Sequence, residues 1–287
     1  MSSPLDLLCS WVSRQAGDEA EWFAKYINQL KAGAPERDLH IVLGLAPRKL
    51  GRADLDLSEQ DLADAQAAHD GWKPSGWTID GAARVAALLC HGAQRPFAER
   101  FKDLRRTADV GELIALYRGL PLYPEPETLG FECGEGLRSH MRAVFEAIAH
   151  NNPYPRDHFD EHRWNHMILK ALFVESELAP ILGIDERANP DLARILRDYA
   201  HERWAAGRTL TPELWRPVGP FVTDEMVEDL ERVIRDEDPM QQEAGALALS
   251  QSPSPKAAAL LNEFPALKAR IDSGELTWDS FSENRLV

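Results

Sequence analysis

Residues 236–261, DEDPMQQEAGALALSQSPSPKAAALL, contain the clearest indication of the fold of this chain. Asp238-Pro239 and Ser254-Pro255 each place a helix-capping side chain before a proline, which is favoured at the first position of a helix. The stretch therefore predicts a helix, a short turn and a second helix. Such pairs are the repeating unit of HEAT-like and armadillo-like α-solenoids. We predict an all-α protein built from stacked antiparallel helix pairs.

The same combination of a capping residue followed by a proline recurs along the chain. After Asn189-Pro190, apolar residues from Leu192 to Tyr199 fall on one helical face, and Gly207 follows as a stop. Thr211-Pro212 repeats the pairing, and a further apolar face follows Thr223. In the first half, helices are expected near Leu5–Gln15, Asp18–Lys31, Ser58–His69, Thr78–Leu89, Gln94–Thr107 and Gly111–Arg118.

The apolar run Leu39–Leu45 is short enough to be a strand. A sheet needs several strands, and no partner with an alternating pattern exists, so we assign the run to a helix or turn. Irregular structure is expected at Arg48–Leu57, Gly71–Trp77, Leu120–Gly130 and Asn151–Arg156.

The sequence favours one continuous domain over residues 1–287, because no linker composition interrupts it. No clean repeat period covers the whole chain, so a compact all-α domain is the alternative to a solenoid. The tail Glu275–Val287 contains Trp278 and Phe281, and it either packs as a final cap or stays loose.

The composition excludes several classes of function. A formal net charge of −15 disfavours non-specific nucleic-acid binding and docking on an anionic membrane. No apolar run is long enough to cross a bilayer, and the first residues lack the features of a signal peptide. Cys9, Cys90 and Cys133 are far apart in sequence, which fits reduced, packed thiols. We expect a cytoplasmic protein without nucleic acid, membrane insertion or cofactor.

The candidate site is HNNPYPRDHFDEHRWNHMILKALFV, residues 150–174, where a helix is expected to begin near Asp160. At about 100° per residue, the helix carries two different faces. The apolar face contains Trp164, Met167, Ile168, Ala171 and Leu172. The other face contains Phe159, His162, Arg163, His166 and Lys170. This second face either lines a cleft for an anionic or hydroxyl-rich ligand, or is an exposed or interface-covered face.

The turn before this helix also carries polar side chains. Asn152 precedes Pro153 and is driven out of the helical conformation. Its side chain either bonds to local backbone in a rigid turn or points into a pocket. We predict a ligand-binding set formed by Arg48, Asn151, Asn152, Tyr154, Arg163, Trp164, Asn165 and Lys170. Arg48 would clamp an anion or cap a helix end, and in an enzyme His166 or Lys170 would be the acid–base group.

His162 and His166 also have the spacing of two metal ligands on one helix. The basic neighbour Arg163 opposes a cation, and the glutamate of a zinc-protease motif is missing. We therefore predict no metal at this pair.

The signature of the candidate segment resembles that of the EboA family. The residues that carry the resemblance are Asn152-Pro153-Tyr154-Pro155, Phe159-Asp160-Glu161, Trp164-Asn165 and Leu169-Lys170-Ala171-Leu172-Phe173. Ala46-Pro47-Arg48 supports it, and His166 departs from it, since relatives are expected to carry Gln or another polar residue there. The resemblance implies an all-helical bacterial protein of a secondary-metabolite operon. Its neighbours there would include a TatD-like hydrolase, a prenyltransferase-like membrane protein and relatives of sugar-metabolising enzymes.

Three functions are compatible with this sequence. The first is binding of a small polar metabolite, or of another protein of the same operon, in a pathway that makes or moves a secondary metabolite. The second is an enzyme acting on a phosphorylated or cyclitol-like compound. The third is a scaffold in which the signature only fixes a helix junction.

Overall fold

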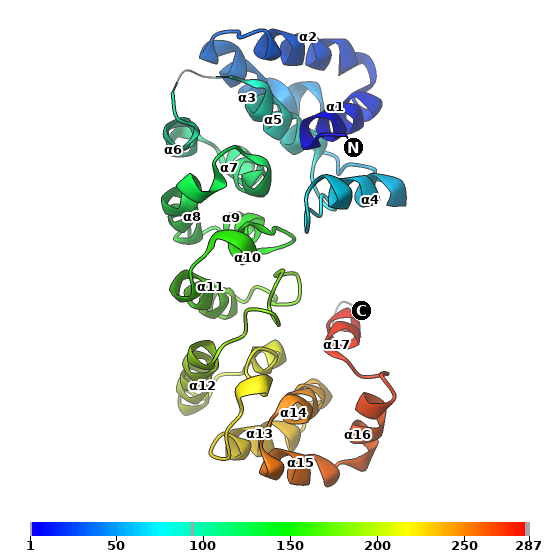
Figure 1. Cartoon of the computed structure of the whole chain (residues 1–287), viewed down its shortest axis with the longest axis vertical. Helices are drawn as coiled ribbons and strands as arrows, with labels where there is room; N and C mark the ends of the chain where they lie inside the picture. Colours follow the sequence, from blue (N-terminus) through cyan, green and yellow to red (C-terminus); the bar gives the residue numbers. More distant parts are fainter. Residues whose placement is uncertain (1, 93–94, 285–287) are drawn as a thin grey trace. The chain divides into compact units, whose positions relative to one another are not determined.

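The computed structural model describes residues 2–92 and 95–284. Over these residues the chain forms helices α1 to α17 and short 3-10 turns, with no strand beyond an isolated bridge between Asp54 and Thr78. Figure 1 shows the order of the helices along the chain. The all-α prediction is confirmed. The chain divides into two compact units, Met1–Phe159 and Asp160–Val287, and the single domain over 1–287 stays a prediction.

In unit 1, helices begin at capping residues that can be recognised in the sequence. Ser3 and Asp6 form a capping box at the start of α1, and Ser58 and Asp61 form another at α4. The helices of this unit are α1 (Pro4–Gln15), α2 (Ala20–Lys31), α3 (Glu36–Lys49), α4 (Glu59–Ala68), α5 (Ile79–Cys90), α6 (Phe97–Thr107), α7 (Val110–Arg118), α8 (Gly130–Leu137), α9 (Arg142–Ala149) and α10 (Tyr154–His158).

Helix α5 is the centre of unit 1. Its sequence is rich in alanine, and only Gly81 and Leu89 of the helix are not buried. It packs against α1, α2, α3 and α7. Because small side chains let neighbouring helices approach closely, an alanine-rich helix fits this central position.

The helices predicted for unit 1 are present, with shifted ends. Leu39–Leu45 lies inside α3, which continues to Lys49, so Arg48 is helical rather than irregular. Tyr154–Arg156 likewise belongs to α10. Pro155 stands in the first turn of α10, a position where a proline is tolerated. Gln94, the expected start of α6, lies outside the described residues.

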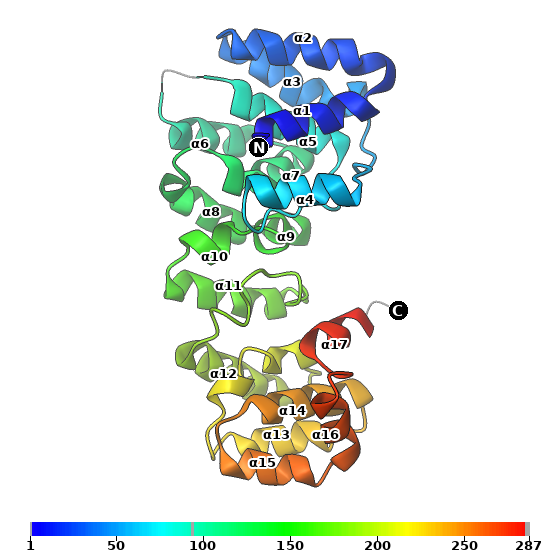
Figure 2. The ribbon, with the colours of Figure 1, turned by 45° about the vertical axis from the view of Figure 1, so that its right-hand side comes forward.

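The helix pair predicted from residues 236–261 is present in unit 2 as α14 and α15. Helix α14 contacts α13, α15, α16 and α17, and the SQSPSP turn joins it to α15. Figure 2 shows this group from a second side. The helices of unit 2 are α11 (Glu161–Phe173), α12 (Pro190–Ala205), α13 (Val227–Ile234), α14 (Pro239–Gln251), α15 (Pro255–Asn262), α16 (Pro265–Asp272) and α17 (Trp278–Asn284). In the described part of the chain, no helix has the length and apolarity needed to cross a bilayer.

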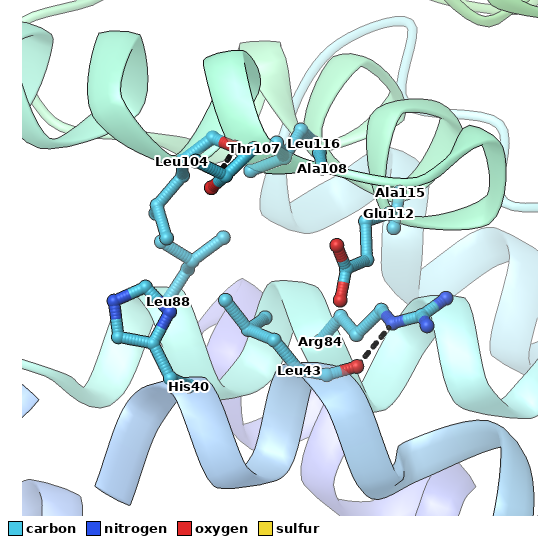
Figure 3. Close-up of a pocket in the computed structure, with 10 residues that line it drawn as sticks. All are labelled: His40, Leu43, Arg84, Leu88, Leu104, Thr107, Ala108, Glu112, Ala115 and Leu116. Atoms are coloured by element: carbon cyan, nitrogen blue, oxygen red, sulfur yellow. Dashed lines mark hydrogen bonds between the residues drawn. The ribbon is translucent and has the colours of Figure 1, made fainter. Parts of the chain in front are cut away.

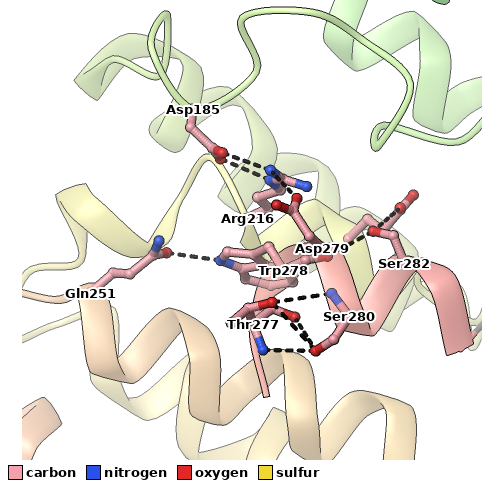
Figure 4. Close-up of polar contacts among 9 residues, drawn as sticks. Asp185, Arg216, Gln251, Thr277, Trp278, Asp279, Ser280 and Ser282 are labelled. Atoms are coloured by element: carbon pink, nitrogen blue, oxygen red, sulfur yellow. Dashed lines mark hydrogen bonds and ion pairs between the residues drawn. The ribbon is translucent and has the colours of Figure 1, made fainter. Parts of the chain in front are cut away.

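The tail packs as a final cap as far as Asn284, and residues 285–287 lie outside the described part of the chain. Trp278 and Phe281 of α17 are buried. The Trp278 Nε1–H donates to Gln251 Oε1 at 3.0 Å (Figure 4). Arg216 binds Asp185 through two hydrogen bonds and also contacts Asp279 of α17 at 3.4 Å. Helix α17 therefore closes unit 2 through an apolar and a charged contact.

Candidate functional site

Asn152 is buried at the junction between α9 and α10, with 3% of its surface exposed. Its Nδ2 donates to the carbonyl oxygens of Tyr117 at 3.0 Å and Ala147 at 3.1 Å. Its Oδ1 accepts from the Tyr154 backbone N–H at 3.0 Å. These bonds join α7, α9 and α10, so the Asn152 amide is committed to backbone groups inside unit 1.

The other predicted site residues of unit 1 have different surroundings. Tyr154 is buried, and its hydroxyl donates to the Pro126 carbonyl at 2.7 Å. Asn151 is exposed and adopts the left-handed conformation, with φ of 50°. Arg48 is exposed in the last turn of α3, and its guanidinium makes no hydrogen bond or ion pair with a described residue. The structure brings Asn152 and Tyr154 together and shows no bond from Arg48 to either.

Helix α11 of unit 2 begins after Asp160, whose Oδ1 accepts from the Arg163 backbone N–H at 2.7 Å. Trp164 is fully buried in the first turns of this helix. The Arg187 guanidinium lies 4.7 Å from the centroid of the Trp164 ring, within the range of a cation–π contact. Trp164 is therefore part of the packing of unit 2.

Asn165 connects α11 to the start of α12 through hydrogen bonds. Its side chain exchanges two hydrogen bonds with the side chain of Asn189, at 3.1 and 2.9 Å. Asn189 is the N-cap of α12, where its Oδ1 accepts from the Leu192 backbone N–H at 2.8 Å. The Asn165 amide is therefore used in holding two helices together.

One face of α11 carries three basic side chains and a phenyl ring that are exposed or half-buried. We call it the α11 stripe, and it consists of His162, His166, Lys170 and Phe173. The two imidazole rings stack with centroids 4.2 Å apart. Lys170 is half-buried, and this burial lowers the pKa of its amine. Phe173 is 75% exposed, an unusual position for a phenyl ring. Within the described residues, no group of three or more His, Cys, Asp or Glu side chains is placed to hold a metal ion.

A pocket that was not predicted from the sequence lies in unit 1. It lies where α3 and α5 meet the connection between α6 and α7 (Figure 3). Its enclosed volume is about 30 Å³, which is room for one or two water-sized groups. Leu43, Leu88, Leu104 and Leu116 form apolar walls, and the polar lining is His40, Arg84, Thr107 and Glu112. The pocket can therefore admit one small polar end of a ligand.

Arg84 is the buried cation of this pocket, with 2% of its surface exposed. Its Nε–H donates to the Leu43 carbonyl at 2.9 Å, and its Nη1 donates to Asp80 Oδ2 at 2.9 Å. The Leu43 carbonyl is available because the residue four positions later is Pro47, which has no N–H to complete the helical bond. The proline inside α3 thus supplies the acceptor that orients the guanidinium.

The hydrogen bonds of Arg84 are incomplete. A guanidinium has five N–H groups, and the two bonds above leave three without a partner among the described residues. Asp80 balances the charge of Arg84, although its own Oδ1 is buried without a hydrogen bond within the described residues. Glu112 also lines the pocket, while its Oε2 caps α7 by accepting from the Asp109 backbone N–H at 3.1 Å. The pocket therefore offers unused donors and a carboxylate, with one negative charge in excess.

A second hollow lies in unit 2, between α12 and α13. It is an open groove of about 430 Å³. The Arg232 guanidinium lies 4.4 Å from the Trp204 ring centroid. Asp229 accepts from His201 Nε2 at 2.8 Å and from Arg197 Nε at 2.7 Å, so this carboxylate is already paired. Arg232 and Glu228, which also line the groove, make no hydrogen bond or ion pair with a described residue.

These features define an all-α protein of packed helices with a small polar pocket inside its first unit. The chain belongs to the EboA family, whose model, described as Metabolite traffic protein EboA, matches residues 5–219. The resemblance seen in residues 152–173 is confirmed by this match, and membership gives the chain a general role in metabolite traffic. No match was found among curated proteins or among solved structures.

The sequence contained one signal of the pocket. Ala46-Pro47-Arg48 reads in the sequence as a basic turn after the apolar run Leu39–Leu45, with Arg48 as an anion clamp or a helix cap. The structure shows that Pro47 is the informative residue, because it frees a carbonyl for Arg84. Arg84 itself stands in the alanine-rich run of α5, where nothing in the spacing distinguishes it from a surface residue.

Proposed function

We propose that this chain binds a small, neutral, hydroxyl-bearing metabolite and holds its polar end in the Arg84 pocket. The observation that supports the proposal most strongly is the Arg84 guanidinium, which is buried yet has three N–H groups without a described partner. A ligand oxygen that accepts from one of these N–H groups would form a charge-assisted hydrogen bond, which is stronger than a bond between neutral groups.

The charges around the pocket favour a neutral ligand over an anion. Asp80 already balances Arg84, and Glu112 adds a further carboxylate to the lining. An anion would be repelled by Glu112, whereas a hydroxyl group can accept from Arg84 and donate to Glu112. The surrounding leucines would contact an apolar part of the same molecule.

The position of the pocket in the chain supports a role shared by the family. Its lining residues, from His40 to Leu116, all lie inside the matched range 5–219. The groove of unit 2 needs Glu228, Asp229 and Arg232, which lie beyond that range. A function common to the family is therefore better placed at the pocket than at the groove.

Binding can be tested by saturation-transfer NMR on the full chain. The probes are a panel of small polyols, monosaccharides and hydroxylated aromatic compounds, with matched carboxylates and phosphates. We expect signals from neutral hydroxylated compounds. Glu112→Gln should weaken these signals, because the amide keeps an acceptor for the helix cap and loses the negative charge that attracts a hydroxyl donor. Binding of anions alone, strengthened by Glu112→Gln, would overturn the proposal.

A steric variant separates the pocket from the rest of the surface. Ala108 is the half-buried C-cap of α6 and lines the pocket, so Ala108→Leu should block entry without removing a polar group. Ala16 is the half-buried C-cap of α1 and does not line the pocket, which makes Ala16→Leu the matched control. We expect the signals to disappear in the first variant and persist in the second.

A second candidate function is attachment of a partner protein at the α11 stripe. Phe173, at 75% exposed, favours it, since a large exposed aromatic side chain is a common anchor of protein interfaces. Lys170 and His166 are then contact residues rather than acid–base groups. Size-exclusion chromatography with a TatD-like hydrolase, the operon neighbour that the family resemblance implies, tests this candidate. Phe173→Ser should abolish co-elution, and the exposed Phe131→Ser in unit 1 is the matched control.

A further inference from the structure

Helices α12 and α13 line the open groove of unit 2. Each helix contributes three lining residues, which are His201, Trp204 and Ala205 from α12 and Glu228, Asp229 and Arg232 from α13. Positions three and four apart lie on one face of a helix, so each helix turns one face towards the groove. The volume of about 430 Å³ admits a whole small molecule.

The Asp229 carboxylate of this groove is already neutralised. Its Oδ2 accepts from Arg197 Nε at 2.7 Å, and its Oδ1 accepts from His201 Nε2 at 2.8 Å. Arg197 and His201 stand four residues apart on α12, so both hold the same carboxylate of α13. Asp229 therefore joins the two helices, and both of its oxygens have a partner.

Arg232 and Glu228 are in a different state. They stand four residues apart on α13, the spacing at which opposite charges commonly pair on a helix surface. They form no ion pair with each other, nor a hydrogen bond or ion pair with another residue that the structure describes. The Arg232 guanidinium lies instead 4.4 Å from the Trp204 ring centroid. The Trp204 ring stacks in turn on the buried Trp215, with centroids 6.0 Å apart.

This stacking positions the Arg232 guanidinium and leaves its N–H groups available. A guanidinium that lies on an aromatic ring presents N–H groups around its edge, in the planar arrangement that matches a carboxylate. Glu228 offers the complementary group, a carboxylate that can accept from an ammonium. The groove thus presents one unpaired cation and one unpaired anion from neighbouring turns of α13.

We propose that this groove binds an α-amino acid as its zwitterion, with the carboxylate on Arg232 and the ammonium on Glu228. The ligand side chain then contacts Trp204 and Ala205. Glu228 repels a simple anion and Arg232 repels a simple cation, whereas a zwitterion is attracted by both. Residues four apart on a helix have Cβ atoms about 5–6 Å apart, so both partners lie within reach of one small zwitterion.

The groove and the pocket of unit 1 have no lining residue in common. This second site therefore does not rest on the proposed function, and either can fail without the other.

The indole N–H signal of Trp204 reports on the groove in NMR spectra of the full chain labelled with isotopic tryptophan. Trp204→Phe assigns this signal by its loss. The probes are glycine, leucine and phenylalanine, together with isocaproate and isoamylamine, which are leucine without its ammonium and without its carboxylate. We expect leucine to shift the Trp204 signal saturably. Isocaproate and isoamylamine should each bind at least about tenfold more weakly, because each loses one charge-assisted hydrogen bond.

Two kinds of result would overturn the proposal. The first is an unchanged Trp204 signal with all three amino acids. The second is a half-molecule that binds as tightly as leucine, since tight isocaproate would define a plain anion site and tight isoamylamine a plain cation site.

Two substitutions assign the partners of the two charges. Arg232→Gln should weaken leucine at least about tenfold and leave isoamylamine unchanged or tighter, because a like charge is removed. Glu228→Gln should weaken leucine similarly and leave isocaproate unchanged or tighter.

The matched controls are Glu231→Gln and Arg235→Gln. Glu231 and Arg235 have the same spacing, form an ion pair at 2.9 Å and do not line the groove. Leucine affinity should be unchanged in both controls, with all four variants folded by circular dichroism. Unchanged leucine affinity in either groove variant, or equal losses in the controls, would contradict the assignment.

Discussion

Pro47 and Arg84 lie on different helices of unit 1 and meet at one carbonyl group. Pro47 has no N–H to donate to Leu43, and the Arg84 Nε–H occupies that acceptor at 2.9 Å. An interior proline usually costs a helix about 3 kcal/mol or more. Here the carbonyl that Pro47 leaves without a helical donor holds a buried guanidinium in place beside the pocket.

Pro47→Ala should separate helix stability from pocket function. Alanine is the best helix former, so the urea midpoint should stay unchanged or rise. The new N–H competes with Arg84 for the Leu43 carbonyl, so binding of the hydroxylated probes should weaken. Equilibrium urea unfolding and saturation-transfer NMR measure the two effects. A lower midpoint with unchanged binding would show that Pro47 serves stability alone.

Arg84 and Asp80 should behave as one buried pair. Arg84→Met leaves the Asp80 carboxylate buried without its cation, and we expect a loss of about 3–5 kcal/mol in the free energy of unfolding. The double variant Arg84→Met/Asp80→Leu should recover much of that loss, because no buried charge remains. A double-mutant cycle by urea unfolding checks this, and strictly additive losses would contradict the pairing.

Adjacent asparagines should respond in opposite ways. Asn152→Ala removes three hydrogen bonds to backbone groups, so we expect a loss of about 2–4 kcal/mol in the free energy of unfolding. Asn151 has φ of 50°, so Asn151→Gly should be neutral or stabilising by up to about 1 kcal/mol. Urea unfolding compares the two. If Asn152→Ala retains full stability but loses a ligand, its role is in binding rather than in the junction.

Asp61 should make unit 1 sensitive to acid. Hydrogen bonds from Arg14, Ser58 and Trp11 hold the pKa of this buried carboxyl far below its ordinary value. A depressed pKa adds stability above the unfolded value of about 3.9, and this contribution is lost as the pH falls toward the folded value. Asp61→Asn should therefore be less stable than the natural protein at pH 7, with the gap closing below about pH 4. A constant gap across this range in urea titrations would contradict the assignment.

The elements of the fold could be predicted because their signals are local. Asp238-Pro239 and Ser254-Pro255 mark the starts of α14 and α15, and the apolar stripe with Trp164 marks α11. The Arg84 pocket could not be predicted, since the Arg84–Leu43 bond joins residues on two different helices.

The segment of residues 150–174 shows a different limit of prediction from sequence. Its composition marked Asn152 and Asn165 as special, and both do make several side-chain hydrogen bonds. A sequence does not tell whether an amide meets a ligand or the backbone, because both uses need the same donors and acceptors. Asn152 bonds to backbone groups at the α9–α10 junction, and Asn165 bonds to the residue that caps α12.

Binding of a neutral hydroxylated metabolite in the Arg84 pocket can be measured by native mass spectrometry of freshly purified protein. The natural chain is compared with Ala108→Leu and Ala16→Leu. We predict a bound small molecule on the natural chain and on Ala16→Leu, released as a neutral hydroxylated compound and missing from Ala108→Leu. A bound anion, or a molecule retained equally by Ala108→Leu, would contradict the claim.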